Sequence, residues 1–355
     1  MLFAYTYVPN NLEKLQAWLK HLVQQVWCNP RRHFYLRLLE SEFQDVVRET
    51  TKASRKNDYL WDPIRRIHNI CRDQLNAPQR LLLSRWFDDN NNIESLCSGN
   101  AGVQPVTYQD IEAINPTLAE ELDLFCTNLW THVRKLKPVC NRVGTLEEHF
   151  KAFKHINRIG ICPFCGISRI EGVFSDIQED FDHYLPKGTY PFNAVAMKNL
   201  APICDKCNKK FKLQKDPLID NTGARRRAFY CYAAVPPGIN IRINIVQIGG
   251  APIDPSNLSP NNVQLEITAS GWDEELDGWK ELFDVVSRYK DICCGGDAGG
   301  NYWLEQVLGE MKCRGLSPTE ALAVIVRAAS VSKWADMNFI KVPFLNACSI
   351  AGIIR

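Results

Sequence analysis

The sequence predicts an α+β protein with a helical N-terminal region, a cysteine-rich central core and a C-terminal region of mixed strands and helices. Three observations predict it. Apolar residues recur at helical spacing through most of residues 1–157, glycine, proline, cysteine and charge dominate 158–230, and apolar and polar residues alternate twice within 231–355. We therefore expect three regions with these boundaries.

The N-terminal region has the sequence period of amphipathic helices. Apolar residues recur at three- and four-residue steps from Leu12 to Val26, and Asn29-Pro30 ends the pattern. Further helices are predicted at 33–50, at 58–75, at 77–88, after the N-cap Asn115 with Pro116, and after the capping box Thr145 and Glu148.

The C-terminal region combines two strand patterns with helices. Residues 241–248 and 263–268 alternate apolar and polar side chains, as a half-buried strand does. One helix is expected over about 273–292. Another is expected from Ser317, where the cap, a first-turn proline and the acid of a capping box agree.

Composition bounds the class of protein. The chain has 355 residues, of which 45% are hydrophobic, enough for one large core or several smaller ones. No apolar run approaches the roughly 20 residues of a membrane-spanning helix, and the first residues do not have the pattern of a signal peptide. We expect a cytoplasmic protein without a membrane partner, in which most of the 14 cysteines are reduced and buried.

Positive charge is concentrated in the middle of the chain. The formal net charge is only +2, yet residues 151–230 hold fourteen Lys and Arg against eight Asp and Glu. A concentrated basic surface is what a polyphosphate partner requires.

Two cysteine pairs have the spacing of a metal site. Cys162 and Cys165 form one C-x2-C motif, and Cys204 and Cys207 form a second, a spacing that lets two thiolates from one tight turn bind a single zinc ion. Redox motifs or four buried thiols are the alternatives. No βαβ pattern surrounds either pair, which disfavours the redox interpretation.

The segment between the two pairs is longer than in a plain zinc ribbon. It holds Phe181-Asp182-His183-Tyr184-Leu185-Pro186-Lys187 and then Asn199-Leu200, and Asn208 directly follows the last cysteine. Read coarsely, this is a strand that ends in Asp-His, an irregular loop, a second short strand and a helix that begins near Cys204.

These residues resemble the HNH, or ββα-metal, nuclease family in its zinc-knuckle variant, over about residues 160–215. The resemblance implies a zinc-bound ββα core that hydrolyses phosphodiester bonds of DNA and leaves a 5′-phosphate and a 3′-hydroxyl. By the same resemblance, His183 is the general base and Asn199 holds the loop that orients it. Asp182 and Asn208 bind one catalytic Mg²⁺ or Mn²⁺, while the four cysteines bind structural zinc.

The residue types suit that chemistry independently of the family. Phosphodiester hydrolysis needs an activated water and relief of negative charge, which an imidazole with an ordinary pKa of about 6.5 and a hard cation with oxygen ligands can supply. A structural Asp-His pair is the alternative for His183, and a solvent-facing side chain is the alternative for Asn208.

Basic residues that follow the core are candidates for phosphate contacts. A solvated charged helix face is the alternative for each. The candidate nucleic-acid-binding residues are Lys209, Lys210, Lys212, Arg225, Arg226 and Arg227.

The flanking regions carry no motif that assigns a function. Stand-alone HNH proteins with similar cores and long flanks resemble effectors of bacterial anti-phage defence, which suggests an ATPase or a reverse transcriptase as a partner. The competing interpretation is a non-catalytic, zinc-stabilised nucleic-acid-binding or scaffold protein. RNA is not excluded as a substrate.

Overall fold

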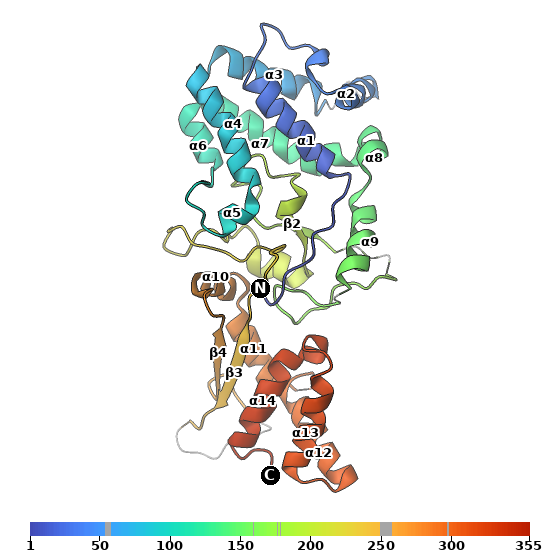
Figure 1. Cartoon of the computed structure of the whole chain (residues 1–355), viewed down its shortest axis with the longest axis vertical. Coiled ribbons are helices and arrows are strands. Elements are labelled where there is room, and N and C mark those ends of the chain that lie inside the picture. Colours follow the sequence, from blue (N-terminus) through green and yellow to red (C-terminus); the bar gives the residue numbers. More distant parts are fainter. Residues whose placement is uncertain (54–57, 159, 176, 178, 249–257, 297) are drawn as a thin grey trace. The chain divides into compact units, whose positions relative to one another are not determined.

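The computed structural model is a mixed α+β protein with many helices and two small antiparallel sheets (Figure 1). It describes residues 1–53, 58–158, 160–175, 177, 179–248, 258–296 and 298–355. Chain contacts group them into two compact units, one formed by Ala4–Gly160 with Ile170–Ala234, and the other by Met1–Phe3, Ile161–Arg169 and Val235–Arg355. The predicted region boundaries near residues 157 and 230 stay a prediction.

The first unit begins with helices, as the apolar periodicity predicts. Among its described residues these are α1 (Glu13–His21), the π-helix η1 (Leu22–Trp27), η2 (Leu36–Leu38), α2 (Ser41–Ala53), α3 (Trp61–Asp73), α4 (Ala77–Asn91), α5 (Ile93–Cys97), α6 (Tyr108–Ile114), α7 (Pro116–Thr131), η3 (Val133–Lys135), α8 (Lys137–Val143) and α9 (Leu146–Asn157).

Capping residues set where several of these helices begin. The Asn115 side chain accepts a hydrogen bond from the backbone N–H of Leu118 and starts α7. Thr145 and Glu148 form the predicted capping box of α9, in which each side chain bonds the other residue's backbone N–H. The single helix predicted over 33–50 is wrong at its start, because a 3₁₀ turn and extended residues precede α2.

A short sheet and a helix follow in this unit. Strand β1 (Phe181–His183) pairs antiparallel with β2 (Leu200–Pro202), so that Asp182 faces Ala201 and His183 faces Leu200 across the ladder. The 3₁₀ turn η4 (Met197–Asn199) leads into β2, and the π-helix η5 (Cys207–Lys212) follows it. This order of strand, strand and helix agrees with the secondary structure predicted for 160–215.

The second unit packs helices around the other sheet. Strands β3 (Asn240–Ile245) and β4 (Val263–Thr268) pair antiparallel along their whole length, and α14 (Asn338–Ile350) lies against β3 (Figure 1). The described helices of this unit are α10 (Asp273–Phe283), α11 (Val285–Cys294), α12 (Gly300–Arg314), α13 (Pro318–Ala329), η7 (Ala335–Met337) and α14 (Asn338–Ile350). No helix of the described residues is long and apolar enough to cross a membrane.

Candidate functional site

The first cysteine pair lies in a tight turn. The backbone N–H groups of Cys165 and Gly166 both point to the carbonyl oxygen of Cys162, at 3.3 and 2.7 Å. Gly166 has a φ of +69°, a conformation that favours glycine, and a Cβ there would require the Leu2 side chain, 2.3 Å away, to move. Trp279 Nε1 donates to the Phe164 carbonyl at 2.7 Å, which ties the turn to α10.

All four cysteines meet at one point. The Sγ atoms of Cys162, Cys165, Cys204 and Cys207 lie within 4.8 Å of one another, and all four residues are buried. Four thiolates around a tetrahedral zinc, each at about 2.3 Å, would lie within this range of one another. The cluster can therefore hold a metal ion such as zinc, as the two motifs predict.

His183 ends β1 with its ring held on one side. Its Nε2 lies 2.8 Å from the carbonyl oxygen of Ala194. A carbonyl only accepts, so Nε2 carries the proton and Nδ1 keeps its lone pair. Burial is the main reason that the pKa of the ring is lowered to about 3, and nearby cations lower it further. The ring is therefore neutral at pH 7, and the same burial makes it a weaker base than an ordinary imidazole.

Asn199 fixes the loop that follows His183. Its side-chain oxygen accepts from the Leu185 backbone N–H at 2.8 Å, and its Nδ2 donates to the Leu185 carbonyl at 2.9 Å. The residue is fully buried. These contacts are of the kind that the resemblance implies for Asn199.

Asp182 has a cation as its neighbour. The Lys212 ammonium lies 3.0 Å from its Oδ2 and 3.2 Å from its Oδ1, and both side chains are buried. Burial raises the pKa of Asp182, and the charge of Lys212 opposes that shift. Asp182 Oδ2 has no hydrogen-bond partner among the described residues, although the ammonium already neutralises the charge of the carboxylate. These contacts do not support the Mg²⁺ or Mn²⁺ predicted for Asp182.

Asn208 has a different acidic neighbour. Its Nδ2 lies 3.5 Å from Oδ2 of Asp180, which also pairs with Lys209 at 3.0 Å. The two residues predicted to share one cation, Asp182 and Asn208, thus have separate partners. Asp180 and Asp182 are two positions apart, so an extended chain turns them to the same side, toward η5.

A polar pocket of about 520 Å³ opens beside this part of the sheet. Asp180, Phe181 and Asn208 line it on the sheet side, and α7 and η3 contribute Trp130 and Arg134. The Trp130 ring meets the His183 ring edge to face, with centroids 4.6 Å apart. His183 is not among the described residues that line the pocket, but Trp130, which does line it, contacts the His183 ring.

Two cations line the same pocket. The Arg134 guanidinium lies 4.2 Å from the centre of the Trp130 ring, and Lys135 follows in the chain. Burial lowers the pKa of Arg134, and its Nε has no hydrogen-bond partner among the described residues. A desolvated guanidinium can bind an anion, but the carboxylates of Glu147, Glu179 and Asp180 line the same pocket and outnumber its two cations.

The predicted phosphate-binding residues differ in exposure. Lys212 and Arg226 are buried, and Arg226 Nε donates to the Pro217 carbonyl at 3.1 Å. Arg225 is exposed and donates to the Leu96 carbonyl at 2.6 Å. Lys209 and Lys210 are exposed on η5, whereas Arg227 is only partly exposed. The exposed members remain candidates for contact with nucleic acid.

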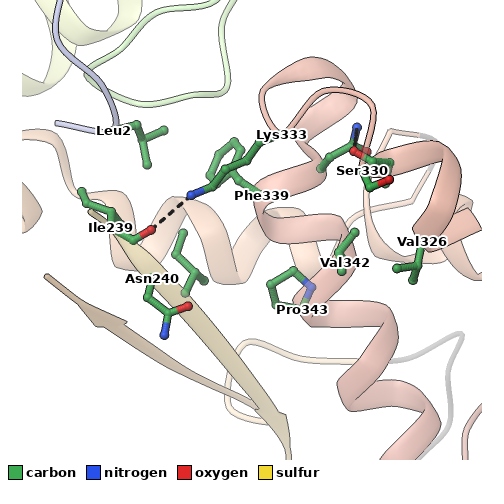
Figure 2. Close-up of a pocket in the computed structure, with 12 residues that line it drawn as sticks. Leu2, Ile239, Asn240, Val326, Ser330, Lys333, Phe339, Val342 and Pro343 are labelled. Carbon is green, nitrogen blue, oxygen red and sulfur yellow. Dashed lines mark hydrogen bonds between the residues drawn. The ribbon is translucent and has the colours of Figure 1, made fainter. Parts of the chain in front are cut away.

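A second cavity, of about 280 Å³, lies in the other unit between β3, α13 and α14 (Figure 2). Its lining is mostly apolar, with Ile241, Phe339 and Val342 among the residues. Lys333 is the only cation among the described lining residues, and its Nζ donates to the Ile239 carbonyl at 3.2 Å. No acid and base face each other there, so the chemistry points to the first unit.

Sequence analysis missed three participants in the first site. Trp130 and Arg134 lie about 50 residues before His183, within helical patterns that gave no sign of a shared pocket. The sequence predicts Lys212 as a phosphate contact, whereas the fold buries it against Asp182. The four-residue spacing of Trp130 and Arg134 was a usable signal for their stacking, but not for their contact with His183.

Comparison with known proteins assigns no family. No family model matches the chain, and no match was found among curated proteins or solved structures. The likeness to HNH nucleases rests on the quoted residues alone.

Proposed function

We propose that this protein is an endonuclease of the HNH type that hydrolyses phosphodiester bonds of DNA with His183 as the general base. The observation that carries the proposal is the contact of His183 Nε2 with the Ala194 carbonyl at 2.8 Å. It fixes the tautomer in which Nδ1 is free to accept a proton from water.

The surroundings of His183 support this role. The Asn199 side chain bonds both the backbone N–H and the carbonyl of Leu185, so the chain after His183 is held in one conformation. A base that is fixed in place before substrate binds loses little entropy in the reaction. In this proposal the water stands at Nδ1, which receives its proton as the oxygen attacks phosphorus. The bond from phosphorus to the 3′-oxygen breaks, and the leaving oxygen takes a proton from solvent water to become the 3′-hydroxyl.

Two cations of the pocket are the proposed phosphate contacts. Arg134 and Lys135 line it, and the Trp130 ring contacts both the Arg134 guanidinium and the His183 ring. A guanidinium can bind two phosphate oxygens at once and stabilise the charge that develops on them. The carboxylates of Glu147, Glu179 and Asp180 also line the pocket and restrict where a phosphate can lie.

The structure supports the structural zinc of the proposal but not the catalytic divalent ion. Structural zinc fits the four cysteines. A catalytic Mg²⁺ or Mn²⁺ at Asp182 and Asn208 is not supported by the contacts of those residues, so no step of the mechanism is assigned to it. A role in anti-phage defence beside an ATPase or a reverse transcriptase, in the cytoplasm, belongs to the proposal as its cellular setting.

One observation favours a second candidate function. Because Lys212 neutralises Asp182 inside the protein, the pair also suits a purely structural core. The second candidate is a non-catalytic, zinc-stabilised protein that binds nucleic acid or serves as a scaffold.

A cleavage assay separates the two candidates. Supercoiled plasmid DNA and a structured RNA are incubated with the zinc-loaded protein, with and without Mg²⁺ or Mn²⁺. His183→Ala should cut at least about a hundredfold more slowly than the wild type, because a general base contributes on the order of that factor. His155→Ala, which removes an exposed histidine of α9, should cut like the wild type. Equal cutting by His183→Ala would remove His183 from the mechanism, and no cutting by the wild type would favour the non-catalytic candidate.

A further inference from the structure

Lys212 is a lysine whose ammonium is buried and has acceptors from the protein around it. Its side chain is 1% exposed and that of Asp182 is 7% exposed. The ammonium donates hydrogen bonds to Asp182 Oδ1 at 3.2 Å and to the His183 carbonyl oxygen at 3.0 Å. Asp182 Oδ2 lies 3.0 Å from it as an ion-pair contact, but has no hydrogen-bond partner among the described residues.

The fold places Lys212 there through η5. This helix begins at Cys207, one of the four clustered cysteines, and ends at Lys212. Leu213 follows with a φ of +52°, so the helix stops directly after the lysine. Asn208, also on η5, contacts Asp180, the residue that directly precedes β1.

We infer that the Lys212 ammonium is the resident cation of Asp182, in the place where the sequence predicts a divalent metal ion, and that it positions His183 through the carbonyl of that residue. Lys212 is thus a positioning residue. Its effect on catalysis rests on the proposed function, whereas its occupation of the Asp182 site does not.

Coordination chemistry favours the ammonium over a divalent ion at this point. Mg²⁺ prefers about six oxygen ligands in octahedral geometry and keeps several waters. Lys212 Nζ instead has the two oxygens of one carboxylate and one backbone carbonyl around it, in a buried position. A metal ion that displaced the ammonium would force the Lys212 side chain into another position. The His183 carbonyl, which accepts from Lys212, would then need a new donor.

Metal binding tests the occupation of the site without any cleavage assay. Free Mn²⁺ is titrated into the zinc-loaded wild type and Asp182→Asn, and bound ions are counted by electron paramagnetic resonance. We expect the same number of ions and affinities within about twofold, because Asp182 binds no Mn²⁺. One ion bound by the wild type and lost in Asp182→Asn would overturn the inference.

A measurement on the wild type alone covers the case in which the variant fails to fold. Crystals soaked in Mn²⁺ should show no anomalous peak at the Asp182 carboxylate, with Lys212 in place. A peak there, with Lys212 displaced, would also overturn the inference.

The positioning role has its own readout. In Lys212→Met combined with Asp182→Asn, which removes both buried charges, nitrogen NMR of the His183 ring should no longer show a single Nε2–H tautomer as in the wild type. If the protein cleaves DNA, kcat should fall at least tenfold with KM within about twofold. An unchanged ring spectrum would refute the positioning role. A wild type without nuclease activity but with the expected spectrum and Mn²⁺ counts would refute only the proposed function.

Discussion

At the residue scale, the His183 region is fixed by three separate contacts. Ala194 accepts from the ring, Lys212 donates to the backbone carbonyl, and Asn199 holds Leu185 two residues later. The contacts come from the loop after β1, from η5 and from the turn before β2. A candidate base that is held from three directions keeps one orientation, which a general base needs.

A buried histidine beside the sheet predicts how stability depends on pH. His149 of α9 is 5% exposed and packs on Phe181, with ring centroids 5.6 Å apart. Burial lowers its pKa to about 4. Below pH 6.5 the unfolded chain takes up a proton that folded His149 does not, so the free energy of unfolding should fall as the pH drops from 6.5 to 4. The slope from this residue is at most about 1.4 kcal/mol per pH unit.

Urea unfolding at several pH values measures this effect. In His149→Phe the slope should be shallower by up to that amount, whereas His155→Phe, at an exposed position of the same helix, should keep the slope of the wild type. His183, whose pKa is also lowered, contributes a slope of the same sign in all three proteins. Equal slopes for the wild type and His149→Phe would contradict the prediction.

Some residues of the site could be predicted from the sequence, and some could not. The cysteine spacing predicted the cluster, because two C-x2-C motifs constrain geometry locally. The Asp-His order led to His183 as a candidate base, which stays a prediction. Lys212 could not be distinguished from its exposed neighbours, because a lysine in a charged helix looks solvated until the fold buries it. Trp130 reaches the site only through tertiary packing.

At the element scale, the sheet that carries His183 is too short to be stable by itself. Its strands β1 and β2 have three residues each, whereas strands usually have about five or six. The segment Cys204–Cys207 follows β2 directly and joins the four-cysteine cluster. A metal ion in the cluster would therefore stabilise β2 and η5 together.

Removal of the metal should loosen this part of the fold. We expect about one zinc per chain in the purified protein. Chelation should make the four clustered thiols reactive toward a thiol reagent and open the segment around 181–212 to protease, because binding energy of a structural zinc is folding energy. Atomic absorption and mass spectrometry of the fragments measure both.

Cysteine variants provide the control for that experiment. Cys207→Ser should lose the zinc and show the same cleavage by protease without chelator. Cys313→Ser, which removes an exposed thiol of α12, should keep the zinc and resist protease. Zinc retained in Cys207→Ser would show that the cluster is not the metal site.

Helices with local capping signals were predicted well, and breaks without such signals were not. The capping box of Ser317 and Glu320 starts α13 as predicted. The single helix predicted over 273–292 is instead two, α10 and α11, because Asp284 adopts a left-handed conformation with a φ of +47°. A non-glycine residue at positive φ follows from packing, which a periodic pattern does not reveal.

At the scale of the whole molecule, the protein has little net charge to attract nucleic acid. The formal net charge is only +2, and some basic residues of the central segment pair with groups inside the protein, as Lys212 does with Asp182. A general attraction to nucleic acid is therefore weak. Any specific affinity has to come from a few exposed cations near the pocket.

Which segments of the chain group into one compact unit is the property that the sequence predicts least. A sequence read in order suggests contiguous regions, whereas each compact unit is assembled from separate stretches, with Ile161–Arg169 grouped apart from the residues on either side of it. The turn at Cys162 is tied to Leu2 by a backbone hydrogen bond of 2.9 Å between Leu2 N–H and the Pro163 carbonyl. No local sequence pattern indicates a contact over such a separation.

The salt dependence of DNA binding tests whether the pocket contacts phosphates. Each phosphate contact contributes about −0.9 to the slope of log affinity against log salt concentration. If Arg134 and Lys135 each bind one phosphate, Arg134→Gln with Lys135→Gln should make the slope shallower by about 2. Fluorescence anisotropy with a labelled duplex between low and moderate salt measures it, and Lys312→Gln, an exposed lysine of α12, is the control with an unchanged slope. An unchanged slope in the double variant would place the phosphate contacts elsewhere, with exposed Lys210 and Arg225 as the next residues to substitute.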